Sequence, residues 1–327
     1  MFALSAHPGQ GVTHLEFSSR ENSELLVSSW DCTLRLYDVA SNTAKATHTY
    51  SAPILDCCFT TDGQYAFAAG LDRSVHSVNL ERGIRGTLAP NCHDKGISSL
   101  AYSTQYQSLY SASWDGSLGV LDPRSTAHTA TSLLNRLQLG EGQIHSISTA
   151  GFSLVAAVAS KKAVIFDVRY LSAPLEVRAS PLKMQLRRVA MHPDGKSFVL
   201  GSTEGRCAIE YVDSGSVELQ SLKYAFKCHR QGDVLYPVNA IAFHPAGTFA
   251  TGGSDGAVCV WDGARKKRQL ALPPLTQPVS ALAFSKDGRL MAIAASRTFE
   301  ESREGDPLEN NIFVRFMQET ETQAKRK

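Results

Sequence analysis

The chain has 327 residues, 43% of them hydrophobic and 20% charged, and its 33 Lys and Arg nearly balance its 31 Asp and Glu, leaving a net charge of +2. This composition provides enough apolar material for a large core and argues against disorder over most of the length. A protein that binds nucleic acid or a membrane surface over its whole face would carry a larger excess of one sign, so only a local charged patch stays open.

The cellular compartment is indicated by the N-terminus and the cysteines. The segment MFALSAHPGQG is broken by Pro8 and Gly9 too soon for a secretory leader, and no stretch approaches the roughly 18 apolar residues of a membrane span. The cysteines are odd in number and never spaced C-x-x-C, which indicates neither a disulfide framework nor a structural zinc site. We expect a soluble intracellular protein in a reducing compartment. The cysteines are Cys32, Cys57, Cys58, Cys92, Cys207, Cys228 and Cys259.

A repeated pattern runs along the chain. Small residues, an acidic or polar turn and an alternating strand recur at 28–39, 69–80, 111–122, 159–168, 202–213 and 252–262. The turns at Asp31, Asp72, Asp115, Lys162, Glu204 and Asp255 are 41, 43, 47, 42 and 51 residues apart. A second apolar strand lies about 25 residues before each turn, and a seventh unit has strands at 289–296 and 311–317 separated by a charged insertion.

This period predicts the fold. Units of forty-odd residues with four short strands each, and no long segment of helical period, are typical of a β-propeller. Seven units fill the chain, so we predict an all-β protein made of a single seven-bladed propeller over 1–317, followed by a disordered basic tail at 318–327. The RKKR run at 265–268 fits either a solvated loop between blades or a nuclear address.

Residues that resemble catalytic or metal sites have structural explanations. His93, Ser111 and Asp115 fit a buried hydrogen-bond set that ties a turn to its blade, and recurrence of such sets argues against a catalytic triad. His192 and His244 each end an inner strand before a turn, where capping is expected instead of metal binding. Without a phosphate-binding glycine motif either, we predict no enzyme activity, no metal and no cofactor.

The fifth unit carries a concentration of positive charge. Successive strands of a blade reverse direction, so the start of the first, the end of the second, the start of the third and the end of the fourth reach one face. With strands at 186–192, 196–202, 206–212 and 223–229, this rule brings four cations to one rim: Arg187, Arg206, Lys227 and Arg230. Such a group suits phosphothreonine or clustered Glu. The alternative is ordinary ion pairing with Glu204, Glu210 or Asp213.

Two tryptophans are predicted on the same face. Trp30 and Trp114 each precede the turn Asp of their unit, and the strand-direction rule places both beside the cationic rim. An aromatic residue there can anchor a partner peptide or pack against a neighbouring loop, and both readings are open. Trp261 lies at the far end of its strand and is predicted to be core.

These motifs carry a family resemblance. VWD at 260–262 and SWD at 29–31 and 113–115 resemble WD repeats. The segments 25–39, 201–213, 223–230 and 236–262 resemble the mitotic-checkpoint WD-repeat family of the budding-uninhibited-by-benzimidazoles group, third member. A sister family of messenger-RNA export WD-repeat factors shares the resemblance more weakly. The first resemblance implies a WD40 propeller acting as a non-catalytic adaptor of the spindle assembly checkpoint.

The resemblance also implies partners and residue roles. A short Glu-containing motif of a checkpoint kinase or pseudokinase would bind near Arg187, Trp30 and Trp114, with Arg230 also in the peptide site. Arg206 and Lys227 match positions that read phosphothreonine in Met-Glu-Leu-Thr-like motifs of a kinetochore scaffold. The family also implies a ubiquitin-ligase inhibitory checkpoint complex, a nuclear and kinetochore location with a cytoplasmic pool, and a monomer that contacts neither membrane nor nucleic acid directly.

Some features depart from the pattern or favour other readings. Lys161 and Lys162 replace an acidic turn, the stretch 130–150 is unlike the family, and the loop 231–236 is short. The messenger-RNA export role is the alternative function. A propeller enzyme would need polar side chains lining the channel, whereas inner strands such as RVAMH and AIAFH read as apolar.

Overall fold

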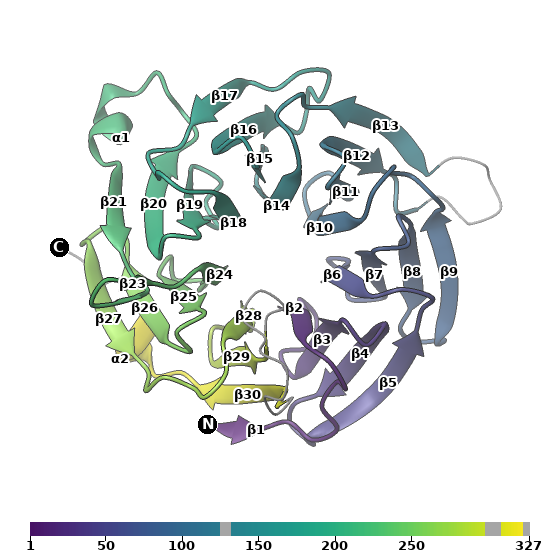
Figure 1. The fold of residues 1–327 in the computed structure, drawn as a ribbon. Coiled ribbons are helices and arrows are strands. Elements are labelled where there is room, and N and C mark those ends of the chain that lie inside the picture. Colours follow the sequence, from purple (N-terminus) through teal and green to yellow (C-terminus); the bar gives the residue numbers. More distant parts are fainter. Residues whose placement is uncertain (125–131, 298–308, 323–327) are drawn as a thin grey trace.

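The strands form a ring of antiparallel blades around a central channel (Figure 1). This computed structural model describes residues 1–124, 132–297 and 309–322. Seven sheets have four strands each, and in six of them the strands follow chain order from the channel outward. The predicted all-β, seven-bladed propeller is confirmed.

The strands of the first six blades are short, and most of them are six residues long. Blade one comprises β2 (Val12–Phe17), β3 (Glu24–Ser29), β4 (Thr33–Asp38) and β5 (Thr43–Thr49). Blade two comprises β6 (Ile54–Phe59), β7 (Tyr65–Gly70), β8 (Val75–Asn79) and β9 (Ile84–Ala89). Blade three comprises β10 (Ile97–Ser103), β11 (Ser108–Ser113), β12 (Ser117–Leu121) and β13 (Leu133–Gln138). Blade four comprises β14 (Ile144–Ala150), β15 (Ser153–Val158), β16 (Lys162–Asp167) and β17 (Glu176–Ala179). Blade five comprises β18 (Leu186–Met191), β19 (Ser197–Ser202), β20 (Arg206–Tyr211) and β21 (Tyr224–Lys227). Blade six comprises β24 (Val238–Phe243), β25 (Phe249–Gly253), β26 (Val258–Asp262) and β27 (Lys267–Ala271).

The seventh blade joins the two ends of the chain. It comprises β28 (Val279–Phe284), β29 (Leu290–Ala295), β30 (Asn311–Phe316) and, at its outer edge, the N-terminal strand β1 (Phe2–Ala3). Phe2 pairs with Val314, and the Leu4 N–H donates to the Ile312 carbonyl at 2.8 Å (Figure 1). The ring is therefore closed by hydrogen bonds between its first and last strands.

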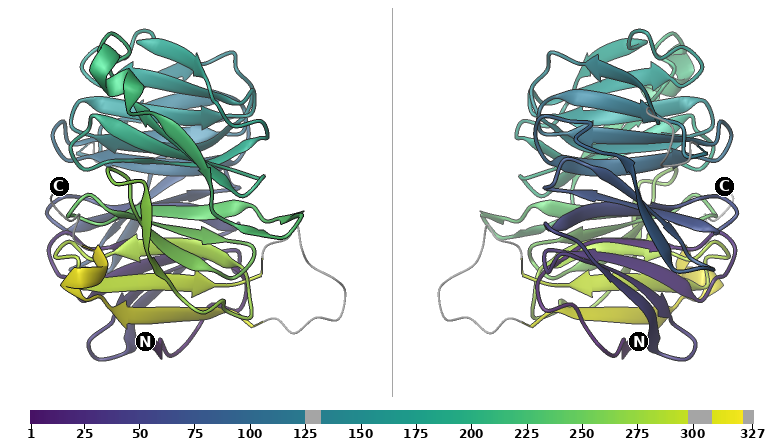
Figure 2. Two further views of the ribbon diagram at one scale, coloured as in Figure 1. Left: turned by 90° about the vertical axis from the view of Figure 1, so that its left-hand side faces the viewer. Right: turned by 90° about the vertical axis from the view of Figure 1, so that its right-hand side faces the viewer.

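Small elements extend the blades. Helix α1 (Val217–Ser221) lies between β20 and β21, and α2 (Glu319–Thr322) follows β30. Both lie toward the same face of the ring in side view (Figure 2). The loop predicted at 231–236 instead contains a hairpin of β22 (Arg230–Gln231) and β23 (Val234–Leu235). The stretch 130–150, where it is described, supplies β13 and β14.

The C-terminal segment differs from the expected disordered tail at 318–327. Residues 319–322 form α2 because Glu321 pairs with Arg315 at 2.6 Å and the Thr322 carbonyl accepts a hydrogen bond from the buried Thr248 hydroxyl at 2.6 Å. Residues 323–327, and the part of the charged insertion at 298–308, lie outside the described residues. No helix in the described ranges is long and apolar enough to cross a membrane.

The core lies between neighbouring blades. The second strand of each blade is buried on both faces, as in β7, where five of six residues are buried. Leu15 and Leu25 of blade one pack with Ile312 and Val314 of blade seven, so the first and last blades share one apolar cluster. This packing fixes the seven inner strands around the channel and positions the side chains that point into it.

Candidate functional site

A β-bulge shapes the channel opening in every blade. Each inner strand shifts register between its first and third residues, as between Leu186 and Arg188 of β18. A bulge redirects the extra side chain, because two residues then oppose one on the partner strand. The seven bulge residues all line one cavity: Thr13, Leu55, Ser98, His145, Arg187, Asn239 and Ser280. We call this cavity, of about 360 Å³, the mouth pocket.

The mouth pocket brings together three of the predicted site residues. Arg187 of blade five lines it with Trp30 and Trp114, which come from blades one and three. Arg188 also lines it from below and continues into a second cavity of about 290 Å³ inside the channel. The pocket therefore combines two aromatic side chains with a guanidinium group, the residue types that dominate peptide-binding energetics.

The two tryptophans are held in equivalent ways. The backbone N–H of Trp30 donates to the Gly11 carbonyl and the backbone N–H of Trp114 donates to the Gly96 carbonyl, both at 3.0 Å. Each ring lies against its glycine, and a Cβ placed on Gly96 would come within 3.3 Å of the Trp114 ring. Both indoles are half-buried. Each ring packs on a neighbouring loop and also lines the pocket. The geometry is therefore compatible with both predicted roles, loop packing and anchoring of a partner peptide.

The other three predicted cations lie on the outer strands of blade five and on the hairpin that follows it. Arg206 begins β20 and stands directly opposite Lys227 at the end of β21, while Arg230 begins the β22–β23 hairpin. Among the described residues that line the mouth pocket, Arg187 is present and these three are not. Arg187 stands at the bulge in β18 and lines the mouth pocket, while the convergence of all four cations at one rim stays a prediction.

The acidic residues considered as partners are engaged elsewhere. Glu210 is buried and pairs with Lys223 at 2.8 Å and Arg178 at 3.2 Å. Glu204 accepts the backbone N–H of Lys183, and Asp213 accepts that of Gly215. Within the described parts of the chain, none of the following three cations has a carboxylate within ion-pair distance: Arg206, Lys227 and Arg230. Two like charges at cross-strand positions repel one another, and an anion between them would relieve that repulsion.

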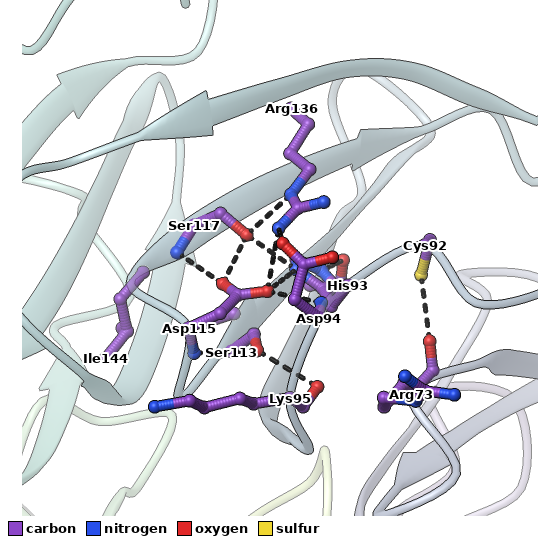
Figure 3. Close-up of polar contacts among 12 residues, drawn as sticks. Arg73, Cys92, His93, Asp94, Lys95, Ser113, Asp115, Ser117, Arg136 and Ile144 are labelled. Carbon is purple, nitrogen blue, oxygen red and sulfur yellow. Dashed lines mark hydrogen bonds and ion pairs between the residues drawn. The ribbon is translucent and has the colours of Figure 1, made fainter.

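The His, Ser and Asp grouping in blade three is structural, as predicted (Figure 3). His93 Nδ1 lies 2.7 Å from the Ser117 hydroxyl and Nε2 lies 2.8 Å from the Ser111 hydroxyl. Burial lowers the pKa of His93 to about 4, so this ring is neutral. Burial alone would raise the pKa of the Asp115 carboxyl, but hydrogen bonds from Ser117 and the Asp94 N–H lower it to about 2. Arg136 donates to Asp115 at 2.9 Å and completes the set.

A similar set links blades five and six, and the repeat pattern did not identify its histidine. His229 Nδ1 lies 2.8 Å from Asp255, and Nε2 lies 3.0 Å from the Thr251 hydroxyl. Trp261 donates to the same hydroxyl at 2.9 Å and packs on Phe226, which agrees with its predicted core role. His229 precedes the Asp255 turn by 26 residues, and His93 precedes the Asp115 turn by 22, so a His somewhat more than 20 residues before a turn Asp is the signal that could have found it.

The channel is more polar than the sequence predicts. Arg188, His14, Glu16 and Asp56 all face the inner cavity, so the expectation of apolar inner strands is wrong for blades one, two and five. His14 Nδ1 lies 3.3 Å from Asp56, and Glu16 accepts the Phe59 N–H at 3.1 Å. Burial raises the pKa of Glu16 to about 8 and lowers the pKa of His14.

These channel groups serve to bind the blades to one another. Asp56 accepts the Leu100 N–H, Ser99 accepts the Ile147 N–H and Ser146 accepts the Val189 N–H. Each bond joins the inner strands of neighbouring blades. The channel polar groups are therefore explained by backbone hydrogen bonding between blades.

The two turn histidines have the predicted capping role. His192 Nδ1 accepts the Asp194 N–H at 3.1 Å, and His244 Nδ1 accepts the Ala246 N–H at 3.0 Å. Over the ranges that the structure describes, no group of three or more His, Cys, Asp or Glu side chains is arranged to hold a metal ion.

The chain is similar to known WD-repeat proteins. A family model described as "WD domain, G-beta repeat" matches residues 1–38, 44–77, 85–122 and 220–262. The mitotic checkpoint protein BUB3.1 of Arabidopsis thaliana is 41% identical over 99% of this chain and 95% of its own length. The spindle assembly checkpoint protein bub3 of Schizosaccharomyces pombe is 32% identical over 87% of this chain and 88% of its own. The mRNA export factor GLE2 of Chaetomium thermophilum is 32% identical over 93% and 86%.

Proposed function

The chain belongs to the BUB3 family of mitotic checkpoint WD-repeat proteins, and from this premise we propose that it is a non-catalytic adaptor of the spindle assembly checkpoint. It binds a short Glu-containing motif of a checkpoint kinase or pseudokinase at the mouth pocket. At the rim of blade five it binds phosphothreonine in Met-Glu-Leu-Thr-like motifs of a kinetochore scaffold. The adaptor thereby brings the kinase to the kinetochore.

One observation carries this proposal: Arg206 and Lys227 face one another across β20 and β21 with no carboxylate partner among the described residues. Neighbouring cations at a strand end lower the stability of the free protein. A phosphate group carries close to two negative charges and three acceptor oxygens, so it can accept hydrogen bonds from both side chains at once. An unphosphorylated threonine offers neither.

The mouth pocket supports the second half of the proposal. Trp30 and Trp114 supply apolar surface, and Arg187 supplies a cation suited to a Glu carboxylate. Because the fifth-blade turn residue Thr203 also lines this pocket, the kinase motif and the phosphopeptide would lie beside one another. The wider assignments, to a ubiquitin-ligase inhibitory complex and to nucleus and kinetochore with a cytoplasmic pool, are part of the same proposal.

The test compares a phosphorylated and an unphosphorylated Met-Glu-Leu-Thr peptide, titrated against the protein with its kinase motif bound. We expect clear preference for the phosphorylated peptide, and a loss of about tenfold or more in affinity on Arg206→Ala or Lys227→Ala, since each removes a charge-assisted hydrogen bond. Lys196→Ala, just before β19 on the opposite face of the same blade, is the matched control and should bind as wild type.

Equal affinity for the two peptides would contradict the phosphothreonine assignment.

The similarity to GLE2 makes messenger-RNA export the second candidate. Fluorescent tagging in dividing cells separates the two: staining of the nuclear rim through interphase, with no foci on unattached kinetochores, would favour export.

A further inference from the structure

Two cysteine side chains meet beside the cationic rim. The sulfur atoms of Cys207 in β20 and Cys228, just beyond β21, lie 3.6 Å apart. All seven cysteines lie in the described parts of the chain, and all are free thiols. Among them, this is the pair whose sulfurs are in contact. Cys207 directly follows Arg206, and Cys228 directly follows Lys227.

The backbone explains how these thiols approach one another. Regular pairing of β20 and β21 ends at Arg206 and Lys227, after which the N–H groups of Cys228 and His229 both donate to the Gly205 carbonyl, at 2.9 and 3.2 Å. This irregular strand end turns the Cys228 side chain toward Cys207. A disulfide has its sulfurs about 2.05 Å apart, so closing the pair needs a shift of about 1.5 Å at a strand terminus.

The two thiols differ in accessibility. Cys207 is fully buried, whereas Cys228 is partly exposed. Burial raises the pKa of Cys207 well above its ordinary value, so this thiol is poorly suited to react first with an oxidant in solution. A partly exposed thiol beside a buried resolving thiol is the arrangement of a redox-responsive pair.

We propose that Cys207 and Cys228 are an oxidation site that forms a reversible disulfide in response to hydrogen peroxide and weakens phosphopeptide binding at the adjoining rim. The first part stands alone, and the second rests on the function proposed above. In a reducing compartment such a bond is transient and is removed by cellular thiols.

The chemistry balances with peroxide as the oxidant. The Cys228 sulfur attacks one peroxide oxygen, the O–O bond breaks, and a sulfenic acid forms while the released hydroxide takes up the thiol proton as water. The Cys207 sulfur then attacks the Cys228 sulfur and displaces its hydroxyl group, which leaves as a second water with the Cys207 proton. Two thiols lose two electrons in total, and one peroxide gains them.

Disulfide formation would act on the rim through the backbone. Drawing Cys228 toward β20 moves the adjoining Lys227 and His229, and the His229 ring is fixed by Asp255 and Thr251. The strain therefore falls on the segment that places Lys227 opposite Arg206. We expect phosphopeptide affinity to fall about fivefold on oxidation.

The first experiment treats the full-length protein with hydrogen peroxide, blocks remaining thiols by alkylation and maps disulfides by mass spectrometry. We expect a Cys207–Cys228 bond that dithiothreitol reverses. In Cys207→Val, Cys228 should instead stop at a sulfenic or higher acid. Cys32→Ser is the control, since Cys32 is also partly exposed, and it should leave the bond unchanged. Oxidation of Cys32 and Cys228 to acids without any Cys207–Cys228 bond would overturn the proposal.

The second experiment measures phosphopeptide affinity of reduced and oxidised protein. A fall in wild type that dithiothreitol reverses, and that Cys207→Val lacks, supports the coupling. Unchanged affinity in protein shown to contain the disulfide overturns it. If the reduced wild type does not discriminate the phosphorylated peptide, the proposed function has failed, while the disulfide map still decides the oxidation site.

Discussion

Single residues in this propeller are placed by hydrogen bonds that span blades. Glu16 lies in the channel, accepts the Phe59 N–H of the next blade and faces Asp56, with His14 and Arg188 lining the same cavity. Burial, the strongest influence on Glu16, raises its pKa to about 8 from an ordinary value of 4.5. The folded protein thus holds a proton that the unfolded chain releases between these two values.

This difference predicts a pH-dependent effect of Glu16→Gln. Because the folded-state pKa is raised, the contribution of Glu16 to the free energy of unfolding falls as pH rises from about 4.5 to about 8. Glutamine keeps the acceptor for Phe59 without the charge, so the variant should match wild type below about pH 4 and exceed it by about 4 kcal/mol at pH 8. Urea unfolding across this range measures the difference.

Comparing variant with wild type isolates Glu16, because His14 titrates in both proteins. A difference that stays constant over the pH range would contradict the assignment and indicate a packing effect. Asp56→Asn is a useful second variant, since its carboxylate accepts the Leu100 N–H and contributes to the raised pKa of Glu16.

At the scale of strands and turns, glycines set the position of the tryptophans. A Cβ on Gly96 would lie 2.9 Å from the Leu71 side chain and 3.3 Å from the Trp114 ring. The loop before β10 can therefore approach the indole only where no side chain intervenes. In the same loop, the Gly96 carbonyl accepts the hydrogen bond of the Trp114 backbone N–H.

Gly96→Ala should displace the Trp114 ring within the mouth pocket. We expect a loss of about 1 kcal/mol in stability from overpacking, a shift in tryptophan emission and several-fold weaker binding of the kinase motif. Gly215→Ala, in an exposed turn before α1, is the control and should change none of the three. Unaltered emission and binding in Gly96→Ala would show that the ring position is not set by this contact.

The strand pattern was largely readable from the sequence, and its limits have physical causes. Alternation and turn residues locate the strands of the blades, because each blade repeats the same local chemistry. A bulge leaves no such mark, since it changes pairing and not composition, so the sequence does not predict that the bulge residues, Arg187 among them, line one cavity. The β22–β23 hairpin has only two residues per strand, too few for alternation to be seen.

Over the whole molecule, the features that the sequence does not predict are contacts between residues far apart in the chain. Nothing in MFALSAHPGQG predicts that Phe2 and Ala3 pair with β30, because a two-residue strand has no period of its own. The polar channel was missed for a related reason. Arg188 and Asp56 become neighbours only when blades two and five face one another across the ring.

Ring closure predicts a large effect at one N-terminal residue. Leu4 is 1% exposed and packs in the cluster shared by blades one and seven. Leu4→Ala should lower the free energy of unfolding by about 3 kcal/mol, through lost burial and the cavity it leaves. Leu134→Ala is the matched control because Leu134 is 63% exposed, and it should cost less than about 0.5 kcal/mol. Similar losses in both variants, measured by denaturant unfolding, would mean that the N-terminal strand does not hold the ring.

The pairing of β1 with β30 also sets an order of events on the ribosome. Blades one to six are each encoded in an unbroken segment, so each can form its sheet as it emerges. Strand β1 (Phe2–Ala3) must instead wait until its partner strand β30 (Asn311–Phe316) has been made. Until then the apolar flank of blade one has no blade seven to cover it. The nascent chain is thus an open arc with an exposed apolar surface at one end. Molecular chaperones would be needed most in the interval before the ring closes.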